Sequence, residues 1–296
     1  MINRLKDIVG ENFIFENESM AEHTTFKCGG NAKLYIQPGS IDELVEVLAV
    51  LRDEDFPYYI IGNGSNLLVR DEGYDGAIVE IDARINDIDV IGDELVVDAG
   101  AKMNKVATVA LDNELTGLEF AHGIPGDMGG ACVMNAGAYG GEMKDVLKWV
   151  KVITKTGEVK TLQADELELG YRTSIIAKEN MIVLQACVKL ELGDANAIAE
   201  MMDFLMMKRK QSQPLEYPSA GSTFKRPEGY YAGKLIQDSG MKGYRVGDAM
   251  VSEKHSGFVI NCGNATATDV LQVIKDVQAK VKETFDVEME PEVKIL

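Results

Sequence analysis

A glycine-rich run between Gly123 and Gly141 restricts the fold of this chain more than any other feature. The run holds seven of the 29 glycines found in 296 residues, and Asp127 is its only charged residue. Glycine costs conformational entropy on folding, and it is used where backbone turns sharply or approaches another group closely. A flexible linker is polar, whereas this run also contains Ile124, Pro125, Met128, Val133, Met134 and Tyr139. The run therefore indicates backbone that wraps around a ligand.

Composition and charge limit the class of protein. An apolar content of 46% and a charged content of 26% are typical of globular proteins, and the length suffices for two or three domains. No window approaches the length of a membrane span, and the N-terminus lacks the apolar core of an export signal. We therefore expect a cytoplasmic protein without membrane insertion. The net charge of −18 disfavours binding to nucleic acid or to anionic membranes.

Cysteine spacing and local charge add two further expectations. The four cysteines lie far apart without a CxxC pair, which favours reduced thiols and argues against a metal site. The segment from Lys225 to His255 carries six basic and four acidic residues, a net charge of +2, so the rest of the chain carries −20. A mildly basic segment suits an anionic small molecule, but chance clustering explains it equally well.

Hydrophobic periodicity predicts an α+β fold, because helices and strands do not alternate in a regular βαβ order. Ser40 and Glu43 form a capping-box pattern before a helix that runs through Leu51. Further helices are predicted at 104–115, 195–210, 230–238 and 268–285, and strands at 58–61, 77–81, 94–98, 149–154, 158–162, 181–190, 256–261 and 293–296. The strands at 149–154 and 158–162 flank Lys155-Thr-Gly157, which predicts a hairpin, and Asp194 is placed to cap the helix that begins at 195. The segment 211–218 contains two prolines after a helix, which predicts a domain junction.

A second glycine turn, Gly62-Asn-Gly-Ser-Asn-Leu67, follows the strand predicted at 58–61. It begins like the dinucleotide fingerprint, but Leu67 replaces the third glycine and a strand follows instead of a helix, so a Rossmann site is excluded. Two interpretations remain open. The turn is either a nest of backbone N–H groups that binds phosphate or a tight hairpin without a ligand. Two such loops in one chain favour a long cofactor that contains a diphosphate.

Five further motifs accompany the two glycine loops, namely 23–30, 171–174, 221–227, 247–255 and 290–293. Together they resemble the UDP-N-acetylenolpyruvoylglucosamine reductase family over nearly the whole chain. The resemblance implies a two-part FAD-binding module of the vanillyl-alcohol-oxidase (PCMH) type plus a C-terminal α+β substrate-binding domain. It implies that residues 1–82, joined by a C-terminal strand at 291–296, form the first FAD-binding part, that 83–210 form the second, and that 211–290 bind substrate.

The family's activity implies NADPH-dependent reduction of the enolpyruvyl ether of UDP-N-acetylglucosamine-enolpyruvate to UDP-N-acetylmuramate, a step of peptidoglycan precursor synthesis. The reaction uses non-covalent FAD. The positions that match the family's cofactor site are Gly62, Asn63, Gly64, Ser65, Asn66, Leu67, Gly123, Gly126, Asp127, Gly129, Gly130, Asn135, Ala136, Gly137 and Tyr139. The positions implied to bind substrate are Tyr171, Lys225, Arg226, Lys254 and His255.

Three residues match the family's catalytic positions. Arg172 would hold the substrate carboxylate, since a guanidinium binds a carboxylate at two points and stays protonated. Ser222 would donate the proton, helped by nearby Lys225 and Arg226. Glu292 would face the developing enolate with a raised pKa, because burial and like charge favour the protonated form. Without the resemblance, a surface salt bridge, a turn serine and a solvated acid would be the ordinary interpretations of these residues.

One departure assigns the chain to a class within the family. Only a few residues separate Ser174 from the strand predicted at Met181, so the tyrosine-bearing substrate loop of the first class has no room. The chain resembles the shorter second class, and Arg226 stands where the first class often has asparagine. The expected partners are a UDP-sugar and NADPH, and the expected state is a monomer. The alternatives are an FAD-dependent sugar or alcohol oxidase of the same superfamily and a non-catalytic nucleotide-sugar binding protein.

Overall fold

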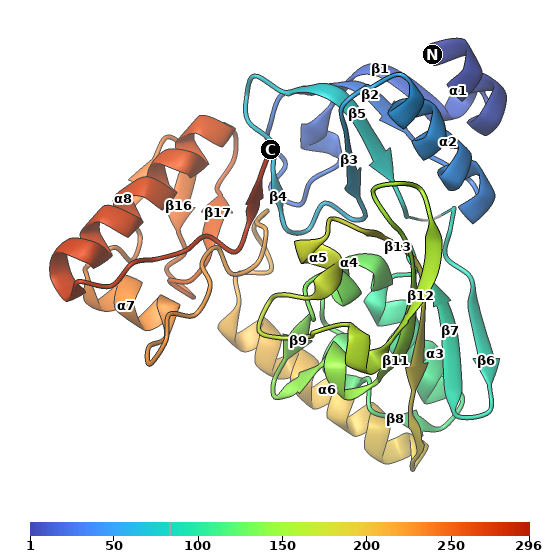
Figure 1. Ribbon diagram of the computed structural model, residues 1–296. Coiled ribbons are helices and arrows are strands. Elements are labelled where there is room, and N and C mark those ends of the chain that lie inside the picture. Colours follow the sequence, from blue (N-terminus) through green and yellow to red (C-terminus); the bar gives the residue numbers. More distant parts are fainter. Residues whose placement is uncertain (83) are drawn as a thin grey trace. The chain divides into compact units, whose positions relative to one another are not determined.

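The computed structural model describes residues 1–82 and 84–296 and divides into two compact units (Figure 1). Unit 1 comprises residues 1–15, 34–63 and 76–209, and unit 2 comprises 16–33, 64–75 and 210–296. The last crossing of the chain, between Arg209 and Lys210, is adjacent to the domain boundary predicted after residue 210. The other predicted boundary begins at Ala83, which lies outside the described residues.

A five-stranded antiparallel sheet forms the larger part of unit 1, in the order β12-β11-β13-β7-β6 (Figure 1). Its strands are β6 (Ile88–Ile91), β7 (Glu94–Asp98), β11 (Leu147–Ile153), β12 (Val159–Gln163) and β13 (Ile182–Lys189). The hairpin predicted around 155–157 is confirmed, because β11 pairs with β12 and Gly157 turns with φ +89. The strand predicted at 181–190 is the central β13, and its apolar sequence is buried on both faces.

Of two helices in this part, one ends earlier than predicted and the other begins where predicted. Helix α3 (Met103–Asp112) ends before Leu115, so the predicted extent of 104–115 is too long. Glu114 takes φ +58, which breaks the helix, and Leu115–Thr116 pair instead as β8 with β14 (Glu191–Leu192). Helix α6 (Ala195–Ser212) begins as predicted, since Asp194 Oδ1 accepts a hydrogen bond from the Ala197 N–H at 2.9 Å.

A four-stranded sheet has the order β1-β2-β5-β3, and the division between the units runs through three of its strands. These strands are β1 (Ile14–Ser19), β2 (Asn31–Ile36), β5 (Tyr74–Glu80) and β3 (Tyr58–Ile61), of which β3 and β5 are parallel. Helix α1 (Ile2–Val9) packs against α2 (Ile41–Asp53). Ser40 caps α2 as predicted, whereas the Glu43 carboxylate accepts from Gly39 N–H at 2.6 Å instead of completing the box with Ser40.

Unit 2 contains a three-stranded antiparallel sheet with two helices. The strands are β15 (Arg245–Val246), β16 (Ala249–Val251) and β17 (Val259–Asn261), and the helices are α7 (Ala232–Asp238) and α8 (Ala267–Phe285). The strand predicted at 256–261 therefore begins three residues late, and the helix predicted from 230 begins at 232. At the C-terminus, β18 (Lys294–Ile295) pairs in parallel with β4 (Leu67–Leu68), directly after the first glycine turn.

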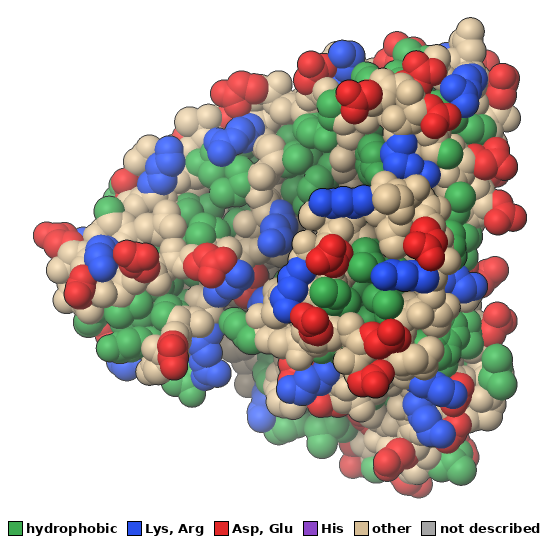
Figure 2. Space-filling model, viewed as in Figure 1, with side chains coloured by type: hydrophobic (Ala, Val, Ile, Leu, Met, Phe, Trp, Pro, Cys, Tyr) green, Lys and Arg blue, Asp and Glu red, His purple; other side chains and the backbone are tan. Residues whose placement is uncertain are grey.

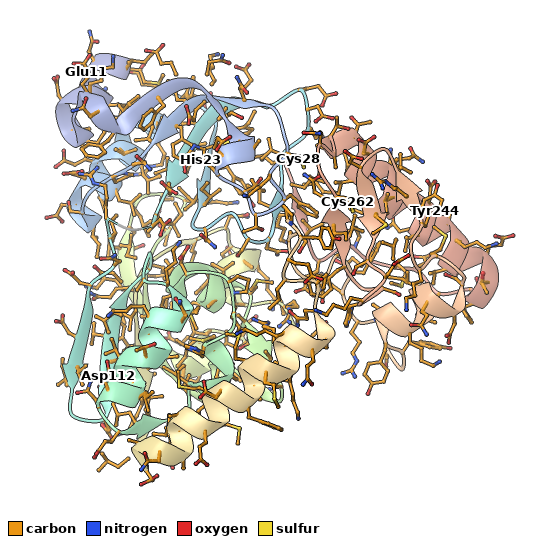
Figure 3. All side chains as sticks on the ribbon, turned by 180° about the vertical axis from the view of Figure 1, so that it is seen from behind. Glu11, His23, Cys28, Asp112, Tyr244 and Cys262 are labelled. Carbon is orange, nitrogen blue, oxygen red and sulfur yellow. The ribbon has the colours of Figure 1, made fainter. Side chains whose placement is uncertain are left out.

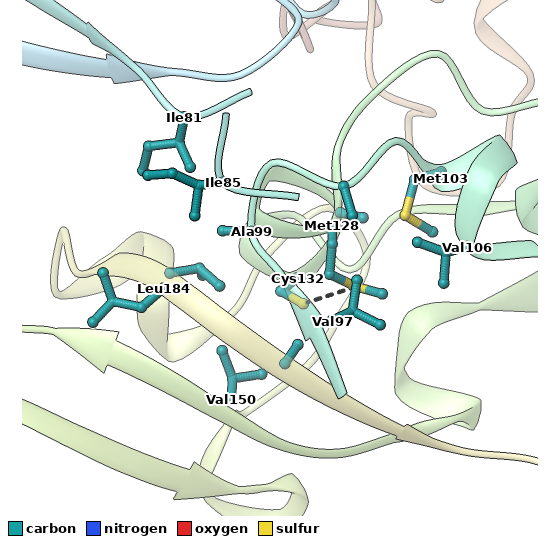
Figure 4. Packing of buried hydrophobic residues seen from close by; sticks show 14 of the residues in the cluster. Ile81, Ile85, Val97, Ala99, Met103, Val106, Met128, Cys132, Val150 and Leu184 are labelled. Atoms are coloured by element: carbon teal, nitrogen blue, oxygen red, sulfur yellow. Dashed lines mark hydrogen bonds between the residues drawn. The ribbon is translucent and has the colours of Figure 1, made fainter. Parts of the chain in front are cut away.

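Each unit has its own hydrophobic core, and the two cores account for the division of the chain into two units. One core runs through unit 1 from Leu5 to Met202, and Figure 4 shows part of it around Met128 and Cys132. The other lies in unit 2 and includes Phe26, Leu68 and the buried face of α8. The core of unit 1 contains residues from both of the predicted FAD-binding parts, 1–82 and 83–210, so the two parts pack together. The division of the chain into three functional parts stays a prediction.

Four further short elements lie in or next to the segments that contain predicted site residues. They are α4 (Met128–Val133), α5 (Ile175–Lys178), β9 (Gly137–Ala138) and β10 (Gly141–Glu142). The mixture of helices with antiparallel and mixed sheets confirms the α+β class. In the part of the chain that the structure describes, no helix combines the length and apolar character needed to cross a membrane.

Candidate active site

The first glycine turn lies between β3 and β4, as the predicted strand–loop–strand requires. Gly64 takes φ +58, and a Cβ at this position would overlap the carbonyl oxygen of His23, so the turn needs glycine for both conformation and space. The Gly64 carbonyl accepts a hydrogen bond from Thr25 N–H at 3.3 Å. Asn66 Nδ2 donates to the carbonyl of Glu292 at 3.2 Å. Within unit 2 the turn is thus fastened to the predicted motif 23–30 and to the C-terminal motif.

One expected phosphate donor of this turn is already bonded within the protein. The Asn63 N–H donates to Asp127 Oδ2 at 2.5 Å, and the Asn63 side-chain oxygen accepts from Lys102 Nζ at 2.9 Å. The phosphate nest expected from the sequence therefore lacks the Asn63 N–H group in this structure. The physical reason is that a buried carboxylate from the second glycine run fills this position.

The second glycine run folds as helix α4 followed by the β9–β10 hairpin, so it is ordered backbone and not a linker. Gly129 lies against Ala99, and its N–H donates to the Ala99 carbonyl at 2.8 Å. At Gly130 and Gly140, by contrast, a Cβ would meet no atom within 4 Å. These two glycines leave open space beside exposed main chain. Such a surface fits a cofactor that is held through backbone contacts.

Other predicted cofactor residues hold the run itself together. Asn135 is fully buried with φ +45, and its Nδ2 donates to Glu142 Oε2 at 2.7 Å and to the Gly170 carbonyl at 3.1 Å. Its Oδ1 accepts from Lys144 N–H at 2.9 Å. Ala136 is buried, and its N–H donates to Ala131. The roles of the fifteen predicted cofactor positions toward FAD stay predictions.

Arg172 is fastened to the glycine run in unit 1. Its backbone has φ +56, an uncommon conformation for a residue other than glycine. Its Nη2 donates to the Gly137 carbonyl at 3.3 Å, and its guanidinium lies 5.3 Å from the centre of the Tyr171 ring. The β-bridge between Gly170 and Thr173 closes this tight turn. The structure thus places the predicted carboxylate-binding arginine beside the predicted cofactor loop.

Ser222 and Glu292 belong to two segments that unit 2 brings side by side. Phe224 and Pro291 form an antiparallel bridge, Glu292 N–H donates to the Thr223 carbonyl at 2.8 Å, and Lys225 N–H donates to the Glu290 carbonyl at 2.9 Å. Thr223 and Phe224 are buried, and Ser222 is exposed at the start of this pair. The two predicted catalytic motifs therefore lie together although they are far apart in sequence.

The two candidate glutamates of the C-terminal motif differ in their surroundings. The Glu290 side chain is 69% exposed and pairs with Lys225 Nζ at 2.5 Å. Glu292 is half-buried and follows the bridge residue Pro291. This contrast favours Glu292 over Glu290 as the catalytic candidate. It also shows that Lys225, a predicted substrate residue, has a carboxylate partner in this structure.

His255 lies close to the serine segment. Its ring packs against Gly233 and Gly257 and meets Phe258 edge-on at 5.1 Å between ring centres. Nδ1 accepts from Gly257 N–H at 3.1 Å, so the neutral ring carries its proton on Nε2. Burial lowers the pKa of His255, which keeps the ring neutral near pH 7. The Gly257 carbonyl accepts from Thr223 N–H, one residue after Ser222.

Two other predicted substrate residues have protein partners. Lys254 Nζ donates to the Lys210 carbonyl at 2.7 Å and lies 3.6 Å from Glu216. The guanidinium of Arg226 lies 4.0 Å over the ring of Tyr231, which is exposed. Tyr231 did not emerge from the sequence, because an isolated exposed tyrosine has no spacing that marks it.

Sequence reasoning also missed three charged residues near the cofactor loops. Lys102 pairs with both Asp127 and Asp82, and Arg209 lies beside Gly123 and Tyr139. Only a lone charge between apolar neighbours marks Lys102 in the sequence, so no pattern could have identified it. Among the described residues, no cluster of His, Cys, Asp and Glu could hold a metal ion.

The sequence matches two family descriptions. Residues 32–163 match the description "FAD binding domain", and residues 213–296 match "UDP-N-acetylenolpyruvoylglucosamine reductase, C-terminal domain". The UDP-N-acetylenolpyruvoylglucosamine reductase of Caldanaerobacter subterraneus subsp. tengcongensis is 51% identical, over 100% of this chain and 98% of the relative. That of Clostridium tetani is 50% identical, over 100% and 96%.

A solved structure agrees with these sequences. The UDP-N-acetylenolpyruvylglucosamine reductase from Thermus caldophilus superposes with a TM-score of 0.81 at 36% identity. The superposition covers 94% of this chain and 97% of that one. The structural likeness therefore extends over nearly the whole length of both chains.

Proposed function

The chain belongs to the UDP-N-acetylenolpyruvoylglucosamine reductase family, and we propose that Arg172, Ser222 and Glu292 are its catalytic residues. As a member of this family it is an FAD-containing oxidoreductase. It reduces the enolpyruvyl ether of UDP-N-acetylglucosamine-enolpyruvate to UDP-N-acetylmuramate with NADPH, in peptidoglycan precursor synthesis. Bound between the glycine loops 62–67 and 123–141, FAD would supply the hydride chemistry that couples NADPH to the vinyl group of the substrate.

Arg172 binds the carboxylate of the enolpyruvyl group in this proposal. Charge builds on that carboxylate and on the neighbouring carbon as the double bond is reduced, so a fixed cation lowers the barrier. The hydrogen bond from Arg172 to Gly137 supports the role, since it orients the guanidinium from the predicted cofactor loop. A lysine in its place would lose the two-point geometry.

Ser222 donates the proton that completes the reduction. The exposure of Ser222 beside the buried Thr223–Phe224 pair supports the role, because substrate can reach its hydroxyl. Glu292 opposes Thr223 across the bridge and faces the developing enolate. The observation that carries the assignment is the antiparallel pairing of the serine segment with the C-terminal motif.

The remaining parts of the proposal concern the substrate contacts, the oligomeric state and the compartment. The UDP-sugar is contacted by the five predicted substrate residues, Tyr171, Lys225, Arg226, Lys254 and His255. The cations among them and the Nε2–H donor of neutral His255 are suited to binding its diphosphate. We propose a monomer in the cytoplasm. The four cysteines are free, in keeping with a reducing compartment.

Ser222→Ala tests the central assignment. The purified wild type should show flavin absorption that bleaches with NADPH and returns with the enolpyruvyl substrate. The variant should still bind FAD and bleach with NADPH, but turnover of substrate should fall by roughly 10²–10⁴. Rapid-mixing spectroscopy separates the two half-reactions.

Ser212→Ala, a serine outside the paired segments, serves as the matched control and should turn over like the wild type. Turnover of Ser222→Ala near the wild-type rate would remove the proton-donor role. Colourless folded wild type would contradict the FAD enzyme itself. Oxygen-dependent oxidation of an alcohol without NADPH would favour the oxidase alternative.

A further inference from the structure

Lys102 and Asp127 form a charged cluster in which the carboxylate is buried and the ammonium is partly exposed, and the proposed proton and hydride steps give it no role. Lys102 Nζ lies 3.1 Å from Asp127 Oδ1, 2.7 Å from Asp82 Oδ1 and 2.9 Å from Asn63 Oδ1. The Asp127 side chain is 2% exposed and that of Lys102 is 35% exposed. One ammonium thus faces two carboxylates and one amide oxygen, all within unit 1.

Main-chain bonds fix the positions of both charged residues. Met103 N–H donates to the Gly126 carbonyl at 2.9 Å, and Met128 N–H donates to the Ala101 carbonyl at 2.9 Å. Met103 and Met128 are fully buried in the core of unit 1, as Figure 4 shows. The residues next to Lys102 and Asp127 therefore anchor the two loops, and the side chains of the pair have one well-defined place to meet.

The cluster reaches the first glycine turn directly. Asp127 Oδ2 accepts from the Asn63 N–H, and Lys102 holds the Asn63 side chain from the other side. A Cβ at Gly62 would overlap Asp127 Oδ2, so Gly62 is the residue that lets the carboxylate approach the turn. The main-chain N–H and the side-chain oxygen of Asn63 are thus both bonded to one ion pair from other segments.

Stability alone does not account for this arrangement. A buried ion pair contributes little net stability, because desolvation offsets the Coulomb attraction. Burial raises the pKa of Asp127 to about 6, although Lys102 works against this shift. Keeping the carboxylate ionised at pH 7 therefore costs the fold free energy. A costly pair that contacts two loops of one ligand site is suited to specifying their conformation.

We propose that Lys102 and Asp127 are cofactor-positioning residues, which hold the Gly62–Asn63 turn against the second glycine run in the conformation that binds FAD. They act through Asn63 and take no part in the proton or hydride steps. This inference rests on the proposed FAD site and adds to it a residue, Lys102, outside the family motifs.

The test measures the dissociation constant of FAD for the full-length chain, by flavin fluorescence and visible absorption. Lys102→Met leaves two carboxylates without their cation, and Asp127→Ala frees the turn. Each should weaken FAD binding by about tenfold or more. In Lys102→Met/Asp127→Asn the excess charge is removed, so the loss should be smaller than the sum of the single losses.

Controls separate positioning from general damage to the fold. Lys105→Met removes an exposed lysine from helix α3, which begins directly after Lys102, and should bind FAD like the wild type. Lys102→Arg keeps a cation and should retain most of the affinity. Should Lys102→Met fail to fold, Asp127→Asn replaces it, because this variant keeps the size and an acceptor for Asn63.

A split between affinity and turnover completes the test. At saturating FAD, Lys102→Met should turn over substrate close to the wild-type rate, whereas its FAD affinity should be lower. Wild-type FAD affinity in Lys102→Met and Asp127→Ala would overturn the inference. Absence of FAD binding by the wild type would instead contradict the proposed function.

Discussion

At the scale of single residues, Asp127 shows how the contacts of one side chain change the interpretation of a glycine-rich loop. The sequence marks it only as the single charge in a glycine run. In the structure its carboxylate is buried between Gly62, Asn63 and Lys102. The Asp127 carboxylate, which the motif assigns to cofactor contact, thus interacts with groups of the protein itself.

The raised pKa of Asp127 predicts a pH dependence of stability. Burial raises the folded-state pKa to about 6, while Lys102 lowers it and Asp82 raises it. The folded state then binds more protons than the unfolded state between about pH 4 and pH 6, so this group lowers stability as pH rises through that window. Asp127→Asn should gain up to about 3 kcal/mol relative to the wild type by pH 7.

Denaturant titrations of apo protein at pH 5 and pH 8 measure this difference. The stability of Asp127→Asn relative to the wild type should be greater at pH 8 than at pH 5. Asp75→Asn changes a carboxylate that is 88% exposed and should show no such trend. An equal difference at both pH values would show that Asp127 titrates normally.

At the scale of elements, the first turn of α8 depends on a residue far away in sequence. The Asp71 carboxylate accepts from the N–H groups of Ala267 and Thr268 at 2.9 and 2.8 Å, and from the Thr268 hydroxyl at 2.6 Å. Thr266 and Asp269 form a capping box on the same turn. Asp71 therefore satisfies helix donors that would otherwise lack partners.

Loss of this cap should destabilise unit 2. Asp71→Ala should lower the free energy of unfolding by about 1–2 kcal/mol, as measured by chemical denaturation at pH 7. Burial raises the pKa of Asp71, but the hydrogen bonds from Thr268 and Ala267 outweigh it and hold the pKa below its usual value. The cap's contribution is therefore present above the ordinary pKa and is lost as pH falls through the lowered one.

The matched control is Asp75→Ala, which removes an exposed ion pair with Lys33 at 2.8 Å. Exposed pairs contribute about 0–1 kcal/mol, so this variant should remain near the wild type. Equal losses in Asp71→Ala and Asp75→Ala would contradict the capping role.

Element predictions succeeded where the local pattern decides and failed where long-range contacts decide. The hairpin at Gly157 and the capped start of α6 follow from short signals, and both are confirmed. The end of α3 was wrong, because the pairing of Leu115 with Leu192 takes residues that the apolar spacing assigns to a helix. Periodicity contains no information about such a distant partner.

At the scale of the whole molecule, charge and ligand binding are the relevant quantities. The chain carries −18, yet Figure 2 shows Lys and Arg side chains interspersed with Asp and Glu over the face viewed. The cysteines are free, and Figure 3 labels Cys28 and Cys262 among the side chains of unit 2. Burial raises the pKa of the Cys28 thiol to about 12, so its thiolate is scarce near pH 7.

FAD should stabilise the whole chain by mass action. A ligand that binds only the folded state at a concentration of about 100 times its dissociation constant adds about 2.7 kcal/mol. The melting temperature of the wild type should therefore rise as FAD is added and fall when FAD is stripped. Differential scanning calorimetry measures this rise, and adenosine serves as the control. A melting temperature independent of FAD would contradict a specific site.

The sequence by itself determined the family, the cofactor and the order of the motifs along the chain. The family and the cofactor follow from the resemblance of motifs such as those around Gly62, Arg172 and Ser222 to a known family, and that resemblance is visible in the sequence alone. Only the tertiary structure decided that Ser222 lies beside the Glu292 segment and that Lys102 grips Asn63 and Asp127. These contacts join residues that are distant in sequence. The energy of each contact depends on its burial and on the distance between the partners, and both exist only after the chain has folded.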